Sequence, residues 1–242
     1  GYGNHRIELD AQTILRNIRS IQNLYDIVPS ETLAKGVAPV NLDIEMETGT
    51  GKTYVYIKTM FELNKQYGWN KFVVVVPSIA IREGVAKSFS MLEDHFMELY
   101  GKKARWFVYD SSKESRIIYS KRDEFGSRRP IDVIAANNPI VIIDEPQKMG
   151  AEDSATQTGI KRFNPLFTLN YSATHKTKHN TIYALDALDA YRQKLVKRIQ
   201  VKGFEVKNLK GTNSFLYLDN IVLSPKKPPM ARIEFETQTA SG

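Results

Sequence analysis

Apolar runs alternate with amphipathic stretches along the middle of the chain, between about residues 41 and 180. Short segments that are continuously or alternately apolar predict strands at 41–46, 71–76, 104–109, 131–135, 140–143 and 167–171. Longer segments with apolar residues at helical spacing predict helices at 53–66 and near 79–99. Because strands and helices follow one another, the pattern predicts an α/β fold, with a mostly parallel sheet and helices on both faces.

The two ends of the chain carry different patterns. Ile14, Ile18 and Ile21 recur at helical spacing, which predicts a helical lead-in. The C-terminal part predicts a helix at 186–196, and then strand-like segments separated by glycine and proline turns, at 198–206, 214–223 and 231–237. We therefore expect three parts, which are the lead-in (1–40), a central domain (41–180), and a helix with a small antiparallel β extension (181–242).

Composition narrows the classes of protein. The chain has 242 residues, of which 42% are hydrophobic, and its net charge of +7 suits a polyanionic partner. It contains no cysteine, which excludes a disulfide framework and a cysteine zinc site. No apolar stretch approaches the ~18 residues of a membrane span, so we expect no membrane association and a cytoplasmic location. His175 and His179, four residues apart, form no convincing metal cluster.

Residues 46–53 read Met-Glu-Thr-Gly-Thr-Gly-Lys-Thr and lie between an expected strand and an expected helix. Gly49 and Gly51 permit backbone torsions that let successive N–H groups point at phosphate oxygens. Lys52 would bind the β- and γ-phosphates of a nucleoside triphosphate, and the Thr53 hydroxyl would bind Mg²⁺. The alternative is a flexible glycine turn before an ordinary amphipathic helix.

A second segment, 141–147, reads Val-Ile-Ile-Asp-Glu-Pro-Gln and is an apolar strand that ends in two carboxylates. In open α/β sheets, ligands bind at the carboxyl ends of the strands. We therefore assign Asp144 to Mg²⁺ and Glu145 to polarising the attacking water. The alternative is a strand that ends in a solvated acidic turn.

These segments resemble motifs I and II of superfamily-two helicase and translocase motors, which are RecA-like P-loop NTPase domains. Val73 to Ser78 and the following Ile79 to Glu83 resemble motif Ia, and Tyr171-Ser172-Ala173-Thr174 resembles motif III. METGTGKT together with Asp-Glu-Pro-Gln looks most like the Res subunit of type III restriction enzymes. The resemblance covers about 40–180, and Met46 departs from the G-x-x-x-x-G-K-S/T pattern at its first glycine.

The resemblance implies ATP and Mg²⁺ as ligands, and it implies a role for particular residues. The triphosphate would be bound by Thr48, Gly49, Thr50, Gly51, Lys52 and Thr53, and the metal by Thr53 and Asp144. The catalytic residues would be Glu145, Lys52 and Gln147, with Gln147 sensing the γ-phosphate and Ser172 and Thr174 coupling its state onward. Nucleic acid would be met by Pro77, Ser78 and Arg82. An ordinary helix N-cap at Ser78 and a solvated helix residue at Arg82 are the alternatives.

The resemblance also implies the wider function, which is ATP-driven movement on double-stranded DNA beside a modification methyltransferase subunit. No second motor domain is recognisable after Thr174. We therefore expect the first motor domain of a longer protein, which binds ATP–Mg²⁺ but hydrolyses it slowly alone, with the nuclease elsewhere. Another superfamily-two DNA or RNA helicase, a nucleotide-dependent switch or kinase, and a non-catalytic scaffold are the alternatives. Gln12 and Gln22 are candidates for reading adenine.

Overall fold

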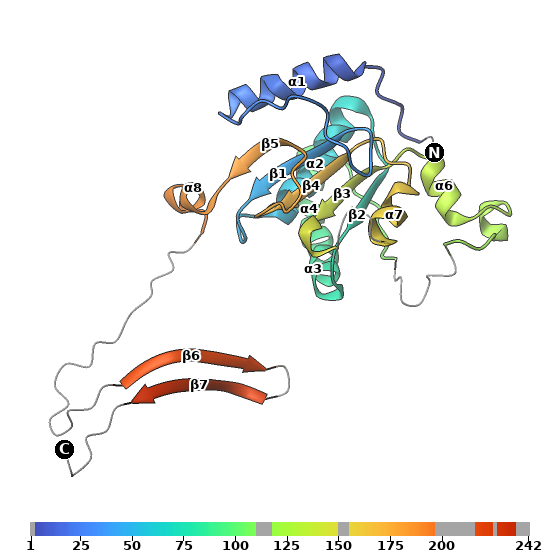
Figure 1. Ribbon diagram of the computed structural model, residues 1–242. Coiled ribbons are helices and arrows are strands. Elements are labelled where there is room, and N and C mark those ends of the chain that lie inside the picture. Colours follow the sequence, from blue (N-terminus) through green and yellow to red (C-terminus); the bar gives the residue numbers. More distant parts are fainter. Residues whose placement is uncertain (1–2, 110–117, 150–154, 197–215, 225–226, 236–242) are drawn as a thin grey trace, which may run out of the picture. The chain divides into compact units, whose positions relative to one another are not determined.

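The chain divides into two compact units, Gly1–Arg198 and Ile199–Gly242. The computed structural model (Figure 1) describes residues 3–109, 118–149, 155–196, 216–224 and 227–235. The first unit holds a sheet with its covering helices. The second unit holds a β-hairpin.

The sheet of the first unit has five strands in the order β2-β3-β4-β1-β5, and every neighbouring pair is parallel. The strands are β1 (Asn41–Met46), β2 (Phe72–Val75), β3 (Ile140–Asp144), β4 (Thr168–Ser172) and β5 (Asn180–Leu185). Asp144 is in register with Tyr171, and Glu45 with Ser172, so the carboxyl ends of β3, β4 and β1 lie together at one edge. This arrangement confirms the predicted α/β class.

Helices cover both faces of the sheet (Figure 1). The α-helices are α1 (Ala11–Leu24), α2 (Lys52–Tyr67), α3 (Ile79–Met91), α4 (Glu93–Tyr100), α6 (Pro130–Ala136), α7 (Ala155–Lys161) and α8 (Ala187–Arg192), and the short 3₁₀ helices are η1 (Asp123–Phe125) and η2 (Pro146–Lys148). The side chains of β3 alternate between two apolar clusters. Ile140 and Ile142 join a large cluster with α2, α3 and α4, whereas Val141 and Ile143 join a small one with Ile160 of α7. A strand that is buried on both faces reads as continuously apolar, as 140–143 does.

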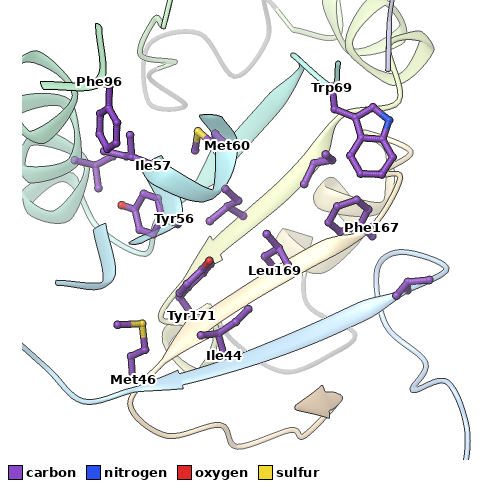
Figure 2. Close-up of a cluster of buried hydrophobic side chains, with 14 of the residues drawn as sticks. Ile44, Met46, Tyr56, Ile57, Met60, Trp69, Phe96, Phe167, Leu169 and Tyr171 are labelled. Atoms are coloured by element: carbon purple, nitrogen blue, oxygen red, sulfur yellow. The ribbon is translucent and has the colours of Figure 1, made fainter. Parts of the chain in front are cut away.

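The large cluster holds α2 against the sheet (Figure 2). Tyr56, Ile57 and Met60 of α2 are 0%, 0% and 8% exposed, and they face Ile44 of β1 and Leu169 of β4. Burying side chains of this size contributes about 1.5–3 kcal/mol each. Because β1 and α2 are fixed in this way, the stretch 47–51 that joins them is held at the carboxyl edge of the sheet.

Two predicted strands are wrong. Residues 104–109 form no strand, and their apolar side chains do not face the sheet: Phe107 is 86% exposed, and the ring of Trp106 lies beside Phe89 of α3. Residues 131–135 belong to helix α6. Pro130 occupies the first turn of α6, where its fixed φ suits a helix and its missing N–H costs nothing.

Three other elements differ from expectation. The helix predicted near 79–99 is two helices, because the chain breaks at Leu92 and restarts with Glu93 and Asp94 in the first turn of α4. The helix predicted at 186–196 is the shorter α8. Strand β5 was not predicted, and it pairs with β1, so the sheet continues past residue 180, where we expected the central domain to end.

The second unit contains β6 (Leu216–Ser224) and β7 (Lys227–Phe235), which pair antiparallel. This hairpin confirms the predicted antiparallel extension for the segments 214–223 and 231–237. The strand predicted at 198–206 lies outside the described residues.

Candidate functional site

The phosphate-loop segment, residues 46–53, joins the end of β1 to the start of α2. Gly49 and Gly51 have φ of +83° and +91°, in the region that side chains disfavour, and a Cβ at either position would meet no atom within 4 Å. Glycine is therefore required there by the backbone torsion rather than by crowding. Gly51 caps α2 without a side-chain hydrogen bond. An uncapped helix N-terminus of this kind favours an anion.

The rest of the loop is organised by Glu47. The Glu47 carbonyl accepts hydrogen bonds from Thr50 N at 3.3 Å and Thr50 Oγ1 at 2.6 Å, and the Glu47 carboxylate accepts one from Thr48 N at 2.7 Å. The Thr48 N–H is thus already used in this state. Thr53 lies partly buried in the first turn of α2.

Lys52 and Glu145, 93 residues apart along the chain, form an ion pair. Lys52 Nζ lies 2.5 Å from Glu145 Oε1, and the two side chains are only 11% and 12% exposed. Lys52 Nζ also lies 3.4 Å from the carbonyl oxygen of Met46. The fold therefore brings the phosphate loop and the acidic end of β3 into direct contact.

Asp144 is buried at the end of β3, with 5% of its surface exposed. Burial raises the pKa of its carboxyl above the ordinary value, the nearby Lys52 opposes this, and the charge of Glu145 adds to the rise. Asp144 Oδ1 has no hydrogen-bond partner among the described residues. A buried carboxylate oxygen without a donor is costly unless a cation binds it, and carboxylate oxygen is the ligand that Mg²⁺ prefers. The donor set therefore fits Mg²⁺.

Glu145 sits on an unusual backbone, with φ 55° and ψ 57°, and its N–H donates to Tyr171 O at 2.8 Å. Burial alone would raise the pKa of its carboxyl. The hydrogen bond and charge of Lys52, together with the Gln147 amide and the charge of Lys148, instead hold that pKa below its usual value. Glu145 is therefore ionised in this state, and it cannot leave its place without breaking these bonds.

A chain of hydrogen bonds continues from Glu145 to the end of β4. Gln147 Nε2 donates to Glu145 Oε2 at 2.5 Å, and Gln147 Oε1 accepts from Ser172 Oγ at 2.8 Å. Ser172 Oγ in turn accepts from Thr174 N at 3.1 Å and lies 2.7 Å from Thr174 O. The residues expected to act in catalysis and coupling thus lie in one connected series.

The three residues expected to contact nucleic acid lie at the end of β2 and the start of α3. Ser78 is the N-cap of α3, and its Oγ accepts from Ile81 N at 3.3 Å. Arg82 Nη2 lies 3.2 Å from Glu83 Oε1. Pro77 is partly buried. A capping role for Ser78 is compatible with phosphate contact, and the nucleic-acid role of all three residues stays a prediction.

Gln22 is not free to read adenine. It is 1% exposed, its Nε2 donates to Ser30 Oγ and Thr181 O at 2.8 Å each, and its Oε1 accepts from Ser30 N at 2.7 Å. Both ends of the amide are therefore used, in holding α1 to β5 through Thr181 and to the following loop through Ser30. Gln12 is exposed on α1. The helical spacing of the lead-in gave no sign of this difference.

Two features are absent from the described parts of the chain. No group of three histidine, aspartate or glutamate side chains there is arranged to hold a metal ion. None of the helices described there combines the length and apolarity that a bilayer crossing requires.

A glycine loop that opens a helix, a lysine paired with a carboxylate at the end of β3, and a buried aspartate beside that carboxylate define a RecA-like nucleotide-binding motor domain. The family model "Type III restriction enzyme, res subunit" matches residues 9–177, and the chain belongs to this family.

Individual relatives agree with the family. The chain is 30% identical to the EcoP15I Res subunit of Escherichia coli and 30% identical to the EcoPI Res subunit of Escherichia phage P1, in each case over 81% of this chain and 25% of the relative. It is 29% identical to the StyLTI Res subunit of Salmonella typhimurium, over 66% of this chain and 22% of the relative. The chain therefore spans about a quarter of the length of the relatives that it matches.

Proposed function

We propose that this chain is the first motor domain of a type III restriction enzyme, which binds and hydrolyses ATP with Mg²⁺ to drive movement on double-stranded DNA. The observation that carries the proposal is the 2.5 Å contact between Lys52 and Glu145, because it joins the phosphate loop to the acidic strand end. In motors of this kind, positioning and charge stabilisation supply nearly all of the catalysis.

Phosphate binding begins with the backbone. The left-handed torsions at Gly49 and Gly51 and the uncapped start of α2 present N–H groups and a favourable partial charge to an anion. Lys52 lies at the same place and supplies a compact positive charge. Thr48, Thr50 and Thr53 flank these groups and complete the proposed triphosphate site.

Binding of ATP changes the state of Glu145. When Lys52 turns to the phosphates, Glu145 loses the strongest of the interactions that depress its pKa, so its pKa rises. Oε1 then becomes free to accept a proton from water, while Oε2 stays oriented by Gln147. Asp144 and Thr53 would hold Mg²⁺, which neutralises charge on the β- and γ-phosphates when bound. Substrate binding in this scheme makes the general base both accessible and more basic.

Coupling to movement would pass through Gln147, Ser172 and Thr174, which bond to one another in series. DNA, the modification methyltransferase subunit and a cytoplasmic setting are parts of the same proposal. They are supported by the family, and by relatives named as type III restriction-modification enzymes.

A nucleotide titration of three variants tests the proposal. Lys52→Ala should weaken ATP binding by about 10–100-fold, the equivalent of ~1.5–3 kcal/mol for a hydrogen bond to a charged group. Lys58→Ala removes an exposed lysine from the same helix and should leave binding unchanged. Glu145→Gln should still bind ATP but lose about 10²–10⁴-fold in turnover. Equal ATP affinity in Lys52→Ala and the wild type would leave the loop without its proposed role.

The kind of nucleic acid is tested by measuring the ATP turnover of the full-length protein with DNA and with RNA. Double-stranded DNA should stimulate ATP turnover more than RNA does. Stimulation by RNA alone would favour the motor of another superfamily-two helicase. The 242-residue chain should bind ATP–Mg²⁺ and turn it over slowly, because a second motor domain supplies arginines worth roughly 10³–10⁵ in rate in related systems.

A further inference from the structure

A buried polar cluster lies beneath the connection between β4 and β5, away from the phosphate loop. Its centre is Asp43, which is 0% exposed in the middle of β1. Asp43 Oδ1 accepts from Asn170 Nδ2 at 2.8 Å and lies 3.0 Å from His179 Nδ1, and Oδ2 accepts from His179 N at 2.6 Å. Because a carboxylate only accepts, His179 Nδ1 carries the proton of that hydrogen bond.

His175 completes the cluster, but it is held less firmly. Its Nδ1 lies 3.8 Å from Asp43 Oδ1, its side chain is 2% exposed, and neither ring nitrogen has a hydrogen-bond partner among the described residues. Burial by itself would raise the pKa of Asp43. The hydrogen bond from the His179 ring and the electrostatic interaction with His175 instead bring that pKa below its ordinary value. Asp43 is therefore a buried, ionised anchor.

The anchor is connected along the chain to two parts of the proposed nucleotide site. Asp43 is on β1, which runs directly into the phosphate loop. His175 and His179 belong to the connection 173–179, which starts at Ser172 and ends where β5 begins. The near end of this connection bonds to Gln147 through Ser172, and its far end bonds to Asp43 through His179. The connection is thus held at both ends, and His175 lies between them.

Ser172 has one hydroxyl proton and two acceptors within reach, Gln147 Oε1 at 2.8 Å and Thr174 O at 2.7 Å. If Gln147 turns toward a γ-phosphate, the Ser172 hydroxyl can donate its hydrogen bond only to Thr174 O. Thr174 immediately precedes His175, whose ring is the one member of the cluster without a hydrogen bond among the described residues. His175 is therefore the group that can respond, whereas His179 is fixed by two contacts to Asp43.

We propose that Asp43 is a positioning residue that ties the connection 173–179 to the phosphate-loop strand, and that His175 reports the state of Glu145 and Gln147 through Ser172. The proposal rests on the proposed function, because it needs a nucleotide at the phosphate loop. It assigns no metal to the cluster, in keeping with the absence of a three-residue metal group from the described parts of the chain.

The test uses the imidazole rings as spectroscopic probes. The protein has four histidines, so histidine-labelled NMR spectra contain few ring signals, and single His→Gln variants assign them. Saturating Mg²⁺ and a non-hydrolysable ATP analogue should shift the His175 signal and leave that of His5, on the lead-in, in place. In Ser172→Ala the shift of His175 should be lost at saturating analogue, because the link to Gln147 is gone.

A second variant tests the anchor itself. Asp43→Asn keeps the shape and an acceptor oxygen but removes the charge. In the full-length protein it should lower the DNA-stimulated kcat by about tenfold while changing the KM for ATP little, since residues along a coupled network alter coupling rather than ligand contact. A purely structural residue would instead lower the unfolding midpoint and leave the kcat of the folded fraction unchanged.

The outcomes are distinguishable. Analogue binding with an unmoved His175 signal, or an unchanged shift in Ser172→Ala, overturns this inference and leaves the nucleotide site standing. Failure of the wild-type protein to bind the analogue overturns the proposed function and this inference together. Ser172 is not part of the cluster around Asp43. The NMR test with Ser172→Ala therefore decides the question even if Asp43→Asn does not fold.

Discussion

Glu145 uses both carboxylate oxygens, one for Lys52 and one for Gln147, on a backbone that only glycine and a few polar residues adopt readily. A non-glycine residue in the left-handed region costs of order 1–3 kcal/mol and persists only where its surroundings enforce it. Here the enforcing contacts are the strand pairing at Asp144 and the hydrogen bond from Glu145 N to Tyr171 O. The strain at this residue fits a site that is organised for chemistry rather than for stability.

Asp144 gives a prediction on pH. Its folded-state pKa is raised, so the folded protein takes up a proton at Asp144 at higher pH than the unfolded chain does. Mg²⁺ needs the ionised form, so Mg²⁺ affinity in the presence of ATP should fall as pH decreases toward this raised pKa, starting above the ordinary value of about 3.9. Calorimetric titration of Mg²⁺ at several pH values measures this. Asp144→Asn should bind Mg²⁺ weakly at every pH, with no such dependence.

The same residue predicts a change in stability. An acid whose folded pKa is raised contributes stability below its unfolded pKa, and that contribution is lost as pH rises through the folded pKa. At pH 7 without nucleotide or metal, Asp144→Asn should therefore unfold at a higher urea concentration than the wild type. A lower midpoint for Asp144→Asn would mean that Lys52 and Lys148 already compensate the buried charge.

At the scale of secondary-structure elements, strands β1 to β4 were predictable and β5 was not. β3 is a continuous apolar run, whereas β1 and β4 alternate polar and apolar residues, and β1 and β3 lead directly into the phosphate loop and the acidic strand end. β5 is buried only at its two ends, Asn180 and Leu185, and it is identified as a strand by its pairing with β1. Residues 131–135 have strand-like composition, yet Pro130 and the Arg129–Asp132 ion pair at 2.7 Å favour the start of a helix.

The candidate site shows the same limit. The residues that we propose for the nucleotide site lie in recognisable motifs, and the fold brings Lys52 of the first motif into contact with Glu145 of the second. Asp43 lies 127 residues before Asn170 and 136 before His179, and these side chains meet only because β1 and β4 lie side by side. The local signals of this cluster were the carboxylate of Asp43 within β1 and the four-residue spacing of His175 and His179, and neither showed that these side chains meet.

The phosphate loop predicts contrasting effects of two glycine substitutions. Gly51→Ala places a side chain at φ +91° and should destabilise the protein by about 1–2 kcal/mol, although no atom obstructs the new methyl group. Gly84→Ala in α3 meets open space at an ordinary φ and should stabilise it by ~0.5–1 kcal/mol. Urea unfolding curves measure both. Equal changes in the urea midpoint for the two variants would show that the backbone torsion at residue 51 is not the reason that glycine is needed there.

The packing of α4 predicts a large loss of stability away from the site. Phe96 is 2% exposed, and its ring stacks on Phe61 at 4.8 Å. Phe96→Ala should cost about 3–5 kcal/mol. Met97→Ala, next to it but 42% exposed, should stay within about 0.5 kcal/mol of the wild type. ATP affinity of the folded protein, measured well below the unfolding transition, should be the same in both variants.

At the scale of the whole molecule, the sheet, its covering helices and both apolar clusters fall within Gly1–Arg198. The hairpin β6–β7 is a separate unit, and a two-stranded hairpin is marginally stable by itself. The family relation covers residues 9–177, which lie within the first unit. The nucleotide chemistry that we propose therefore belongs to the first unit alone.

This division predicts the effect of truncation. A protein that ends at Arg198 should show the same thermal unfolding midpoint and the same ATP affinity as the 242-residue chain, because no residue of the candidate site lies beyond it. Differential scanning calorimetry and nucleotide titration measure the two quantities. A large drop in either would show that residues 199–242 support the first unit.

The Lys52–Glu145 contact has a consequence for the resting protein. An incoming nucleotide competes with an internal anion for the same ammonium group, so its apparent affinity equals the intrinsic affinity reduced by the fraction of molecules in which that group is unoccupied. Neutralising the competitor with Glu145→Gln should therefore tighten ATP binding above the wild-type level even as it slows turnover. Such a variant would accumulate in the nucleotide-bound state, and it would be the form in which to study the occupied site.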